Sequence, residues 1–486
     1  MKNLLALLAV VFSSVVGIGA AAAHEPAAQA RMVPPWQDAS PWPDRVVVTF
    51  AGDPATTLAI NWRTDSTVAA AAAEIVKASP DARFDLAAKR STARTERLDL
   101  ATVKGAAALF DIADNAGLEP VHYHSILFEG LEPDTLYAYR VGAPDGVWSE
   151  WFQVRTAPKS GPITFLYLGD AQNGILSHWA RTIRAAYSKA PNARFIIHAG
   201  DLVDKASRDL EWAQWFKAVG FIHGMIPAVP VAGNHEYMTL PGDPTRTKRL
   251  LSVMWRPQFV LPEVADLPET LRETVYKVAY SADLDVFVLD TQGGSLAEQA
   301  AWLDRELAAS KARWRVATFH HPIFSSGRDR DNADRRAALL PVLRKYDVDL
   351  VLQGHDHTYA RGDLPQQPSR TAGPVKGGAG VGTVFVNSVS GAKQYQWSEG
   401  GWSRYAGEGV RLRRAAENTQ FFQTVTIDGD ALRYEAWTAD GQLYDAFALE
   451  KDKSGVRRER PAPESTLPNR TFTNTGRFED PDGLNK

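Results

Sequence analysis

Between residues 45 and 156, apolar positions alternate with polar ones or form short runs rich in β-branched and aromatic residues. This pattern predicts short strands bounded by turns. Examples are RVVVTFAG at 45–52, TLAINWRTD at 57–65 and HYHSILFEGL at 122–131. Several such strands in succession are typical of an all-β sandwich, which we expect over residues 44–157.

The period of the pattern changes at Ile163. ITFLYLGDAQ at 163–172 and ARFIIHAGDLVD at 193–204 predict buried strands that end in polar turns, whereas HWARTIRAAYSK and EWAQWFKAV have helical spacing. Such alternation predicts a layered α/β domain. LAEQAAWLDRELAAS at 296–310 adds an amphipathic helix, and apolar runs between 382 and 451 add closing strands. We expect this second domain over residues 162–451.

The two ends of the chain differ from these domains. The opening MKNLLALLAVVFSSVVGIGAAAA has one early lysine, an apolar stretch and small residues before His24, as in a secretory signal peptide. An N-terminal membrane anchor is the alternative, because the apolar run approaches spanning length. No later stretch predicts a membrane span. We expect an exported protein of bacterial type, periplasmic or secreted, with a signal peptide at 1–23, a linker at 24–43 and a polar tail at 452–486.

Composition excludes several kinds of site. The chain has 486 residues, 44% of them hydrophobic, and a net charge of −3, which gives no signal for nucleic-acid binding. It has no cysteine, so a cysteine nucleophile, a thiolate zinc site and an iron–sulfur cluster are excluded. Oligomeric state stays open.

Residues that suit metal ions follow five of the predicted strands. Each segment alone fits ordinary turn chemistry, but ligands in open α/β folds gather outside the carboxyl ends of strands, so five in order indicate one site. Oxygen and imidazole ligands without sulfur suit Zn, Mn or Fe. We expect the preceding glycines to let the backbone turn sharply beside the ions. The segments are GDAQ (Asp170, Gln172), GDLVD (Asp201, Asp204), GNHE (Asn234, His235, Glu236), HHP (His320, His321) and GHDH (His355, Asp356, His357).

This order of motifs resembles the calcineurin-like metallophosphoesterase superfamily, over about residues 45–451. The preceding sandwich, whose LEPDTLYAYRV phrase resembles fibronectin type III domains, makes the purple acid phosphatase-like branch the nearest match. The resemblance implies an α/β/β/α-layered domain with two divalent or mixed-valence ions of Fe, Zn or Mn. It implies that Asp201 bridges the ions, that Asp170 and His357 bind the first, and that Asn234, His320 and His355 bind the second.

The resemblance also implies a function. The two ions neutralise a phosphoryl oxygen and activate a hydroxide that attacks phosphorus, while His235 contacts the phosphoryl group or protonates the leaving oxygen. Asn234 contacts the substrate as well. We expect an acid-phosphatase-like phosphomonoesterase acting on small phosphate esters. A phosphodiesterase or nucleotide-cleaving enzyme uses the same site chemistry and is the alternative; a non-catalytic surface-binding module is a third hypothesis.

The chain departs from the family pattern at two positions. Purple enzymes carry a ligating tyrosine where this chain has Asp204, and glycine where it has Gln172. We expect the Gln172 carbonyl to complete the first metal site and the ions to be divalent; the alternative is that Gln172 binds a metal-bound water. Asp204 is either an acceptor for a ligand histidine or a solvated acid. The Arg328 guanidinium either binds the substrate phosphate through two hydrogen bonds or is a solvated charge.

The two adjacent histidines have different expected roles. Neighbouring side chains on an extended strand point to opposite faces, so both cannot easily reach one site. The family pattern His-x-Pro assigns the ligand to His320, and we expect His321 to pack. Glu236 is expected to orient its loop.

Overall fold

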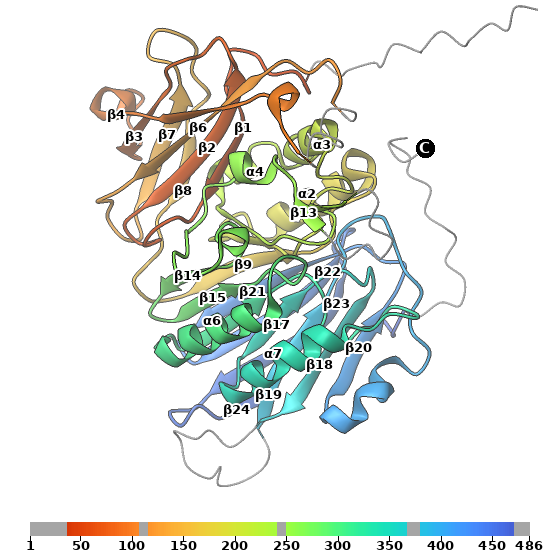
Figure 1. The fold of residues 1–486 in the computed structure, drawn as a ribbon. Coiled ribbons are helices and arrows are strands. Elements are labelled where there is room, and N and C mark those ends of the chain that lie inside the picture. The colour runs from red at the N-terminus through yellow and green to blue at the C-terminus, as the bar shows by residue number, and fades with distance from the viewer. Residues whose placement is uncertain (1–35, 106–114, 241–248, 367–379, 471–486) are drawn as a thin grey trace, which may run out of the picture. The chain divides into compact units, whose positions relative to one another are not determined.

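The computed structural model describes residues 36–105, 115–240, 249–366 and 380–470 (Figure 1). The expected signal peptide at 1–23, the first part of the expected linker and the end of the polar tail lie outside these residues. Within the described ranges, no helix combines the length and the apolar character needed to cross a membrane.

Two antiparallel four-stranded sheets, in the orders β1-β2-β6-β5 and β4-β3-β7-β8, pack face to face around one apolar core and confirm the predicted sandwich. Tyr139 is fully buried in this core and donates from its hydroxyl to the Gly224 carbonyl (2.7 Å). Strands β3 to β5 were not among the predicted segments. The exposed, charged residues of β4 and β5 hide any apolar alternation, whereas β3 is a short, largely buried strand. The strands are β1 (Asp44–Thr49), β2 (Leu58–Asp65), β3 (Ala72–Lys77), β4 (Lys89–Thr92), β5 (Arg94–Leu98), β6 (Val121–Phe128), β7 (Leu136–Gly142) and β8 (Phe152–Arg155).

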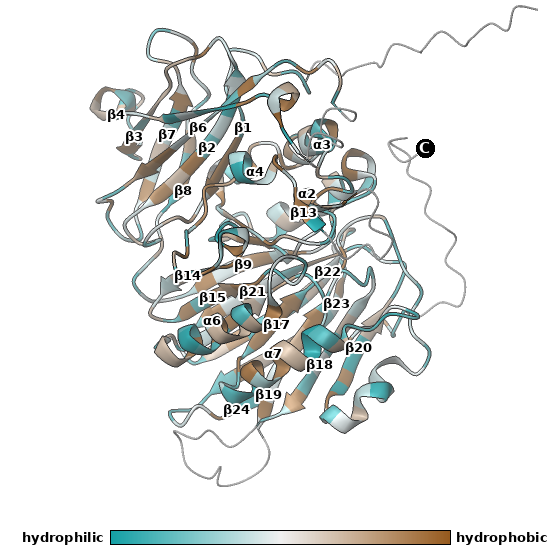
Figure 2. Cartoon of the chain, viewed as in Figure 1, coloured by the Kyte–Doolittle hydropathy of each residue, from teal (hydrophilic) through white to brown (hydrophobic). Residues whose placement is uncertain are grey.

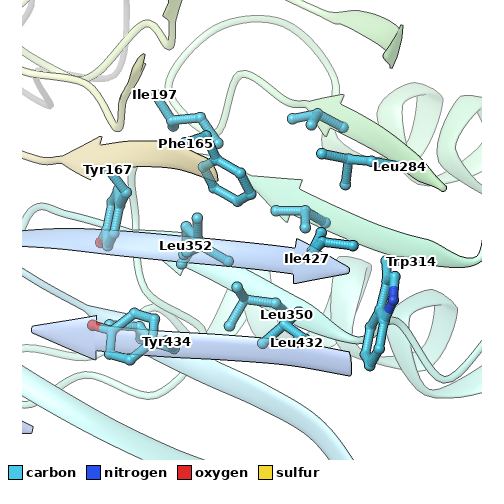
Figure 3. Close-up of a cluster of buried hydrophobic side chains, with 14 of the residues drawn as sticks. Phe165, Tyr167, Ile197, Leu284, Trp314, Leu350, Leu352, Ile427, Leu432 and Tyr434 are labelled. Carbon is cyan, nitrogen blue, oxygen red and sulfur yellow. The ribbon is translucent and has the colours of Figure 1, made fainter. Parts of the chain in front are cut away.

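Two seven-stranded sheets form the centre of the second domain, and their facing side chains make its main core (Figure 3). Alternation along β9 explains the layering, since Phe165 and Tyr167 enter this core while Leu166 and Leu168 point to the other face. The first sheet contains β11 (Ala228–Pro230), β10 (Ile196–His198), β9 (Ile163–Leu168), β21 (Phe421–Asp428), β22 (Ala431–Thr438), β23 (Leu443–Lys451) and β24 (Arg457–Arg460). The second contains β14 (Tyr276–Ser281), β15 (Leu284–Val288), β16 (Trp314–Thr318), β17 (Leu350–Gln353), β19 (Val381–Asn387), β18 (Tyr359–Pro365) and β20 (Arg411–Ala416).

Helices cover the outer faces of both sheets, which confirms the α/β/β/α layering. α2 (Ala180–Lys189) and α3 (Asp209–Val219) pack on the first sheet, and α6 (Leu296–Ala309) and α7 (Ala333–Lys345) on the second. Figure 2 shows hydrophobic residues concentrated on the strands, while α6 and α7 also carry hydrophilic ones. Shorter elements are η3 (Ile175–Trp179, a π-helix), α4 (Ile222–Met225), α5 (Trp255–Gln258), β12 (Tyr237–Thr239) and β13 (Arg249–Leu251).

The elements not anticipated from the sequence include α7 and β24. The segment RRAALLPVLRK reads as charged and contains Pro341, yet it forms α7. Arg457–Arg460, within the expected polar tail, forms β24 and pairs antiparallel with β23. The Arg457 side chain is buried there beside Asp349 (2.5 Å), so this part of the tail belongs to the folded domain.

The parallel strands bring the predicted ligand segments together. β9, β10 and β11 run parallel in the first sheet, and β15, β16, β17 and β19 in the second. Each of the five segments directly follows the carboxyl end of one of these strands, so both sheets contribute residues to the same edge.

His124, in the sandwich, provides a test of stability against pH. Its ring is fully buried between the hydroxyls of Thr64 (2.8 Å) and Thr95 (2.9 Å), and burial, with a smaller effect of His122, lowers its pKa to about 4. As pH falls, His124 therefore becomes protonated in the unfolded chain at a higher pH than in the folded protein. The free energy of unfolding that is present above pH 6.5 is lost as pH falls toward 4. We expect a loss of about 2 kcal/mol of unfolding free energy between pH 7 and pH 5.

The measurement is denaturant unfolding at both pH values. In His124→Gln this part of the pH dependence should disappear, whereas a His178→Gln control in the second domain should keep it. An unchanged slope in His124→Gln would contradict the assignment.

Candidate metal centre

The structure brings one set of donors together at the ends of β10, β11, β16 and β17. Nε2 of His320 lies 3.0 Å from Oδ2 of Asp201, 3.2 Å from Oδ1 of Asn234 and 3.1 Å from Nδ1 of His355. Asp201, His320 and His355 can hold one cation. These are the residues that the resemblance implies for the second metal, with Asp201 as the bridge.

A second set of donors lies on the other side of Asp201. Asp170, Asp201 and His357 are all buried and can hold a cation, and Nε2 of His357 lies 3.5 Å from Oδ1 of Asp170. Asp201 thus belongs to both groups, as expected of a bridging carboxylate. The geometry suits two neighbouring ions that share one ligand.

Backbone carbonyls fix the direction of two of the imidazoles. Nδ1 of His320 donates to the Ala199 carbonyl (2.9 Å), and Nδ1 of His357 donates to the Lys393 carbonyl (2.7 Å). A carbonyl oxygen can only accept, so the ring proton sits on Nδ1 and Nε2 faces the cluster.

Gln172 lies inside the first group and is fully buried. Its amide nitrogen donates to Oδ2 of Asp201 (3.0 Å), and its oxygen lies 3.2 Å from Nζ of Lys393 and 3.1 Å from Nε2 of His357. Burial lowers the pKa of His357 well below its usual range. In the other orientation of the Gln172 amide, its nitrogen donates to the lone pair on Nε2 of His357 (3.1 Å). Either orientation places the amide between Asp201 and His357, and a ligand role for Gln172 stays a prediction.

The electrostatics of the cluster also fit cations. Burial, increased by the nearby Asp201 charge, raises the pKa of Asp170 well above its usual range. Burial alone would lower the pKa of His320, but the facing Asp201 carboxylate raises it to about 9. Two close buried carboxylates need compensating positive charge, and a proton on His320 supplies only one unit. A bound cation would complete the compensation.

Four of these residues have a left-handed backbone that non-glycine residues rarely adopt. Their φ values are 52° at Asp170, 53° at Asp201, 76° at His355 and 43° at His357. Such strain costs ~1–3 kcal/mol per residue and clusters at functional sites. The surrounding fold therefore holds the donors in place.

The glycines before the ligands act differently from expectation. The left-handed turn falls mainly on the ligands themselves, and Gly233 and Gly354 provide space instead. A Cβ on Gly233 would lie 2.3 Å from Oδ1 of Asp201, and one on Gly354 would lie 2.4 Å from Oδ2 of Asp170. Gly200, with φ of 87°, both turns the chain and leaves room for His320.

Glu236 connects two of the ligand loops. Its buried carboxylate accepts from the backbone N–H groups of Asp201 (2.9 Å), Leu202 (2.8 Å) and Gly233 (2.7 Å). It thereby orients the loops after β10 and β11, as the sequence analysis proposed.

His235 lies at the edge of the cluster, with 24% of its side chain exposed. Nδ1 donates to the Asp204 carbonyl (2.6 Å) and lies 3.4 Å from the Asp204 carboxylate, while Nε2 lies 3.9 Å from Oδ2 of Asp201. The ring thus presents Nε2 to the cluster. Asp204 is the partner of this histidine, a contact that the spacing of the motifs did not reveal.

His321 belongs to neither group of donors. Its Nδ1 lies 2.8 Å from the Thr291 hydroxyl, and its ring packs on that of His355, with centroids 4.1 Å apart. This agrees with a packing role rather than a ligand role.

The structure places Arg330, rather than Arg328, beside the cluster. Arg328 is exposed, and its backbone N–H donates to the Gln396 carbonyl (2.9 Å). Arg330 donates to Nε2 of His355 and pairs with Asp356 (2.9 Å). It can turn fully to Asp356 when His355 binds through Nδ1. A role for Arg328 in substrate binding stays a prediction.

Lys393 is a further residue that the sequence analysis missed. It follows β19 in a loop that carries no recognisable motif. Both Lys393 (5.9 Å) and Arg330 (4.9 Å) lie near the ring of Tyr395, whose other neighbour is His357 (4.5 Å). Only the fold brings this lysine to the first group of donors.

Two family models match the chain. Calcineurin-like phosphoesterase matches residues 163–359, and purple acid phosphatase, N-terminal domain, matches residues 43–156. Both support the architecture described above.

Curated relatives include the Fe(3+)-Zn(2+) purple acid phosphatase 12 of Arabidopsis thaliana, 27% identical over 50% of this chain and 52% of the relative. Another is the phosphoenolpyruvate phosphatase of Allium cepa, 27% identical over 49% and 50%. The chain spans about half the length of these relatives.

Among solved structures, a purple acid phosphatase from yellow lupin seeds is similar with a TM-score of 0.66 and 19% identity, covering 85% of this chain and 75% of that one. PhoD is similar with a TM-score of 0.58 and 12% identity, covering 88% and 94%. At these identities the likeness concerns the fold alone.

The paired histidines allow a matched test of the cluster. His320→Ala removes a donor to one ion, so we expect the protein to retain about one fewer ion per chain and to lose more than ~100-fold in turnover of a phosphate ester, since even partners of ligands account for 10–100-fold. His321→Ala should keep the metal content and most of the activity. Elemental analysis of purified protein gives the ion count. Equal metal loss in both variants would overturn the assignment.

Proposed function

The chain carries a calcineurin-like phosphoesterase domain behind a purple acid phosphatase N-terminal domain, and on this basis we propose that it is a dinuclear metal-dependent phosphoesterase that hydrolyses small phosphomonoesters. The observation that carries the proposal is the position of Asp201 in two adjoining groups of metal donors. A surface-binding module would not need two such groups to be buried and oriented.

Seven residues would hold the two ions. When bound, the ions would supply charge neutralisation at phosphoryl oxygens and lower the pKa of a coordinated water. Asp201 would be shared between them. Asp170, Gln172 and His357 would complete the first site, and Asn234, His320 and His355 the second.

His235 would act on the substrate directly. Its Nδ1 is committed to Asp204, so its Nε2 is available toward the cluster. The partial exposure of the ring leaves room for a substrate to reach it. When the ring also carries a proton on Nε2, that atom can donate a hydrogen bond to a phosphoryl oxygen or a proton to the leaving oxygen. The adjacent Asn234 would lie against the same phosphoryl group.

Two features favour divalent ions over an iron(III)-based centre. The position of the ligating tyrosine is taken by Asp204, whose carboxylate lies toward His235 instead of the first group. The neutral Gln172 and the nearby cationic Lys393 further reduce the negative charge around the first ion. The relative from Arabidopsis is named as an Fe(3+)-Zn(2+) enzyme; we propose Zn, Mn or ferrous iron for this chain.

Export belongs to the same proposal. The apolar, small-residue composition of residues 1–23 supports removal of a signal peptide, and an extracytoplasmic location would give access to small phosphate esters outside the cell.

The function is tested with purified full-length protein and a panel of aryl phosphomonoesters and diesters. Chelation should abolish phosphate release, and added Zn or Mn should restore it, with monoesters preferred. The metal-loaded protein should lack the visible absorption of an iron(III)–tyrosinate centre. Hydrolysis of no ester under any metal condition would refute the proposal, and faster release from diesters would favour the phosphodiesterase alternative.

Lys393 should bind the substrate phosphoryl group at the first ion, because its ammonium lies beside Gln172 in a partly exposed position. In Lys393→Met we expect KM for an aryl phosphate and the inhibition constant of inorganic phosphate both to rise about tenfold, or ~1.4 kcal/mol. Lys393→Arg should recover part of this, and the exposed Lys311→Met should change neither. Unchanged phosphate inhibition in Lys393→Met would contradict the role.

A further inference from the structure

We infer that the β-sandwich positions His235, through residues 202–211 of the second domain. This inference rests on the proposed phosphoesterase function, in which His235 meets the substrate. The segment lies between the bridging Asp201 and the first turn of α3. It contacts the sandwich at one end and His235 at the other.

Asn115 makes the first contact from the sandwich. Its side chain is buried, with 3% exposed; Nδ2 donates to the Ser207 carbonyl (2.5 Å) and Oδ1 accepts from the Asp209 N–H (2.8 Å). The side chain thus replaces backbone partners at the start of α3. It fixes both Ser207 and Asp209 to the sandwich.

Arg45 makes the second contact. It forms a two-bond pair with the Asp209 carboxylate (2.8 and 2.9 Å), and Arg63 lies 3.7 Å from the same group. All three side chains are buried. Arg45 has a left-handed φ of 51°, at an irregularity of the β1–β2 pairing. Such a bulge re-aims a side chain, and here the side chain reaches out of the sandwich to α3.

The contact continues from α3 to the catalytic histidine. Glu211, in the first turn of α3, accepts from the N–H groups of Asp204 (2.6 Å) and Lys205 (2.8 Å). Asp204 in turn accepts from His235, and the Ala206 N–H donates to the His235 carbonyl (3.3 Å). The first turn of α3 joins Asp209 to Glu211 along the chain, and the other steps are hydrogen bonds between buried or half-buried groups.

This path differs from the other contacts of the sandwich. Asn61 is as buried as Asn115 and also donates to a backbone carbonyl of the second domain, that of Pro257 (2.7 Å). Pro257 lies in α5 and outside the 202–211 segment. A group that acts on substrate must be held to a fraction of an ångström. Within the described part of the sandwich, Asn115, Arg45 and Arg63 contact the segment under His235.

The experiment compares Asn115→Ala with Asn61→Ala in the metal-loaded, full-length protein. We expect Asn115→Ala to lower kcat about tenfold with KM and metal content nearly unchanged, and Asn61→Ala to stay within about twofold of the wild type. Hydrogen exchange should rise at amides 202–211 in Asn115→Ala alone. Arg45→Lys, which keeps the charge but loses the paired geometry, is a milder variant in case Asn115→Ala folds poorly.

A double-mutant cycle separates positioning from general destabilisation. If Asn115 acts through His235, its effect on kcat should vanish in the His235→Ala background. Losses that multiply in the double variant, or equal losses in the two asparagine variants, would overturn the inference while leaving the proposed function intact. An inactive wild type would instead refute the proposed function, and this inference with it.

Discussion

The sharing of Asp201 by two groups of donors is the constraint on which the rest of the structure depends. Its carboxylate is fully buried beside that of Asp170. The two negative charges repel each other unless cations or protons compensate them. Parallel strands from two sheets end at one edge and supply the remaining donors from both sides. Glu236 then fixes the ligand loops through their backbone N–H groups, and the Ala199 carbonyl fixes the orientation of the His320 ring. Burial of apolar side chains in the two-sheet core stabilises the fold and offsets the cost of bringing these donors together.

The sandwich has a comparable dependence on buried polar contacts. Its own core is apolar, and Val47 and Phe50 extend into the apolar cores of the second domain. Arginine, asparagine and tyrosine side chains add buried polar contacts between the two domains. Buried charged pairs add little net stability but penalise any arrangement that leaves one partner unpaired. The Arg45–Asp209 pair therefore specifies a single docking of the two domains.

Much of the fold and most of the proposed ligands could be predicted from the sequence, because each ligand directly follows an apolar strand and its type is visible in the letters. What could not be predicted depends on side chains from distant segments. Lys393 follows its strand without a motif, and Arg330 differs from Arg328 only by its position in a loop. The partner of Asp204 was equally hidden, since the contact with His235 joins residues 31 apart. Helix α7 was missed because tertiary packing outweighed a charged, proline-containing sequence.

The left-handed backbone of the donors has a consequence for metal choice. A site that needs an ion in order to fold would bind the first ion present during folding, whereas here the strain at Asp170 and its neighbours is carried by the strands and glycines around them. The surrounding fold thus holds the donors in position, and they need not rearrange around a bound ion. Affinities of divalent ions for nitrogen and oxygen ligands follow a common order in most proteins. With donors held in this way, the identity of the ions would depend on ligand type, geometry and supply, and exchange of one divalent ion for another would not require the chain to unfold.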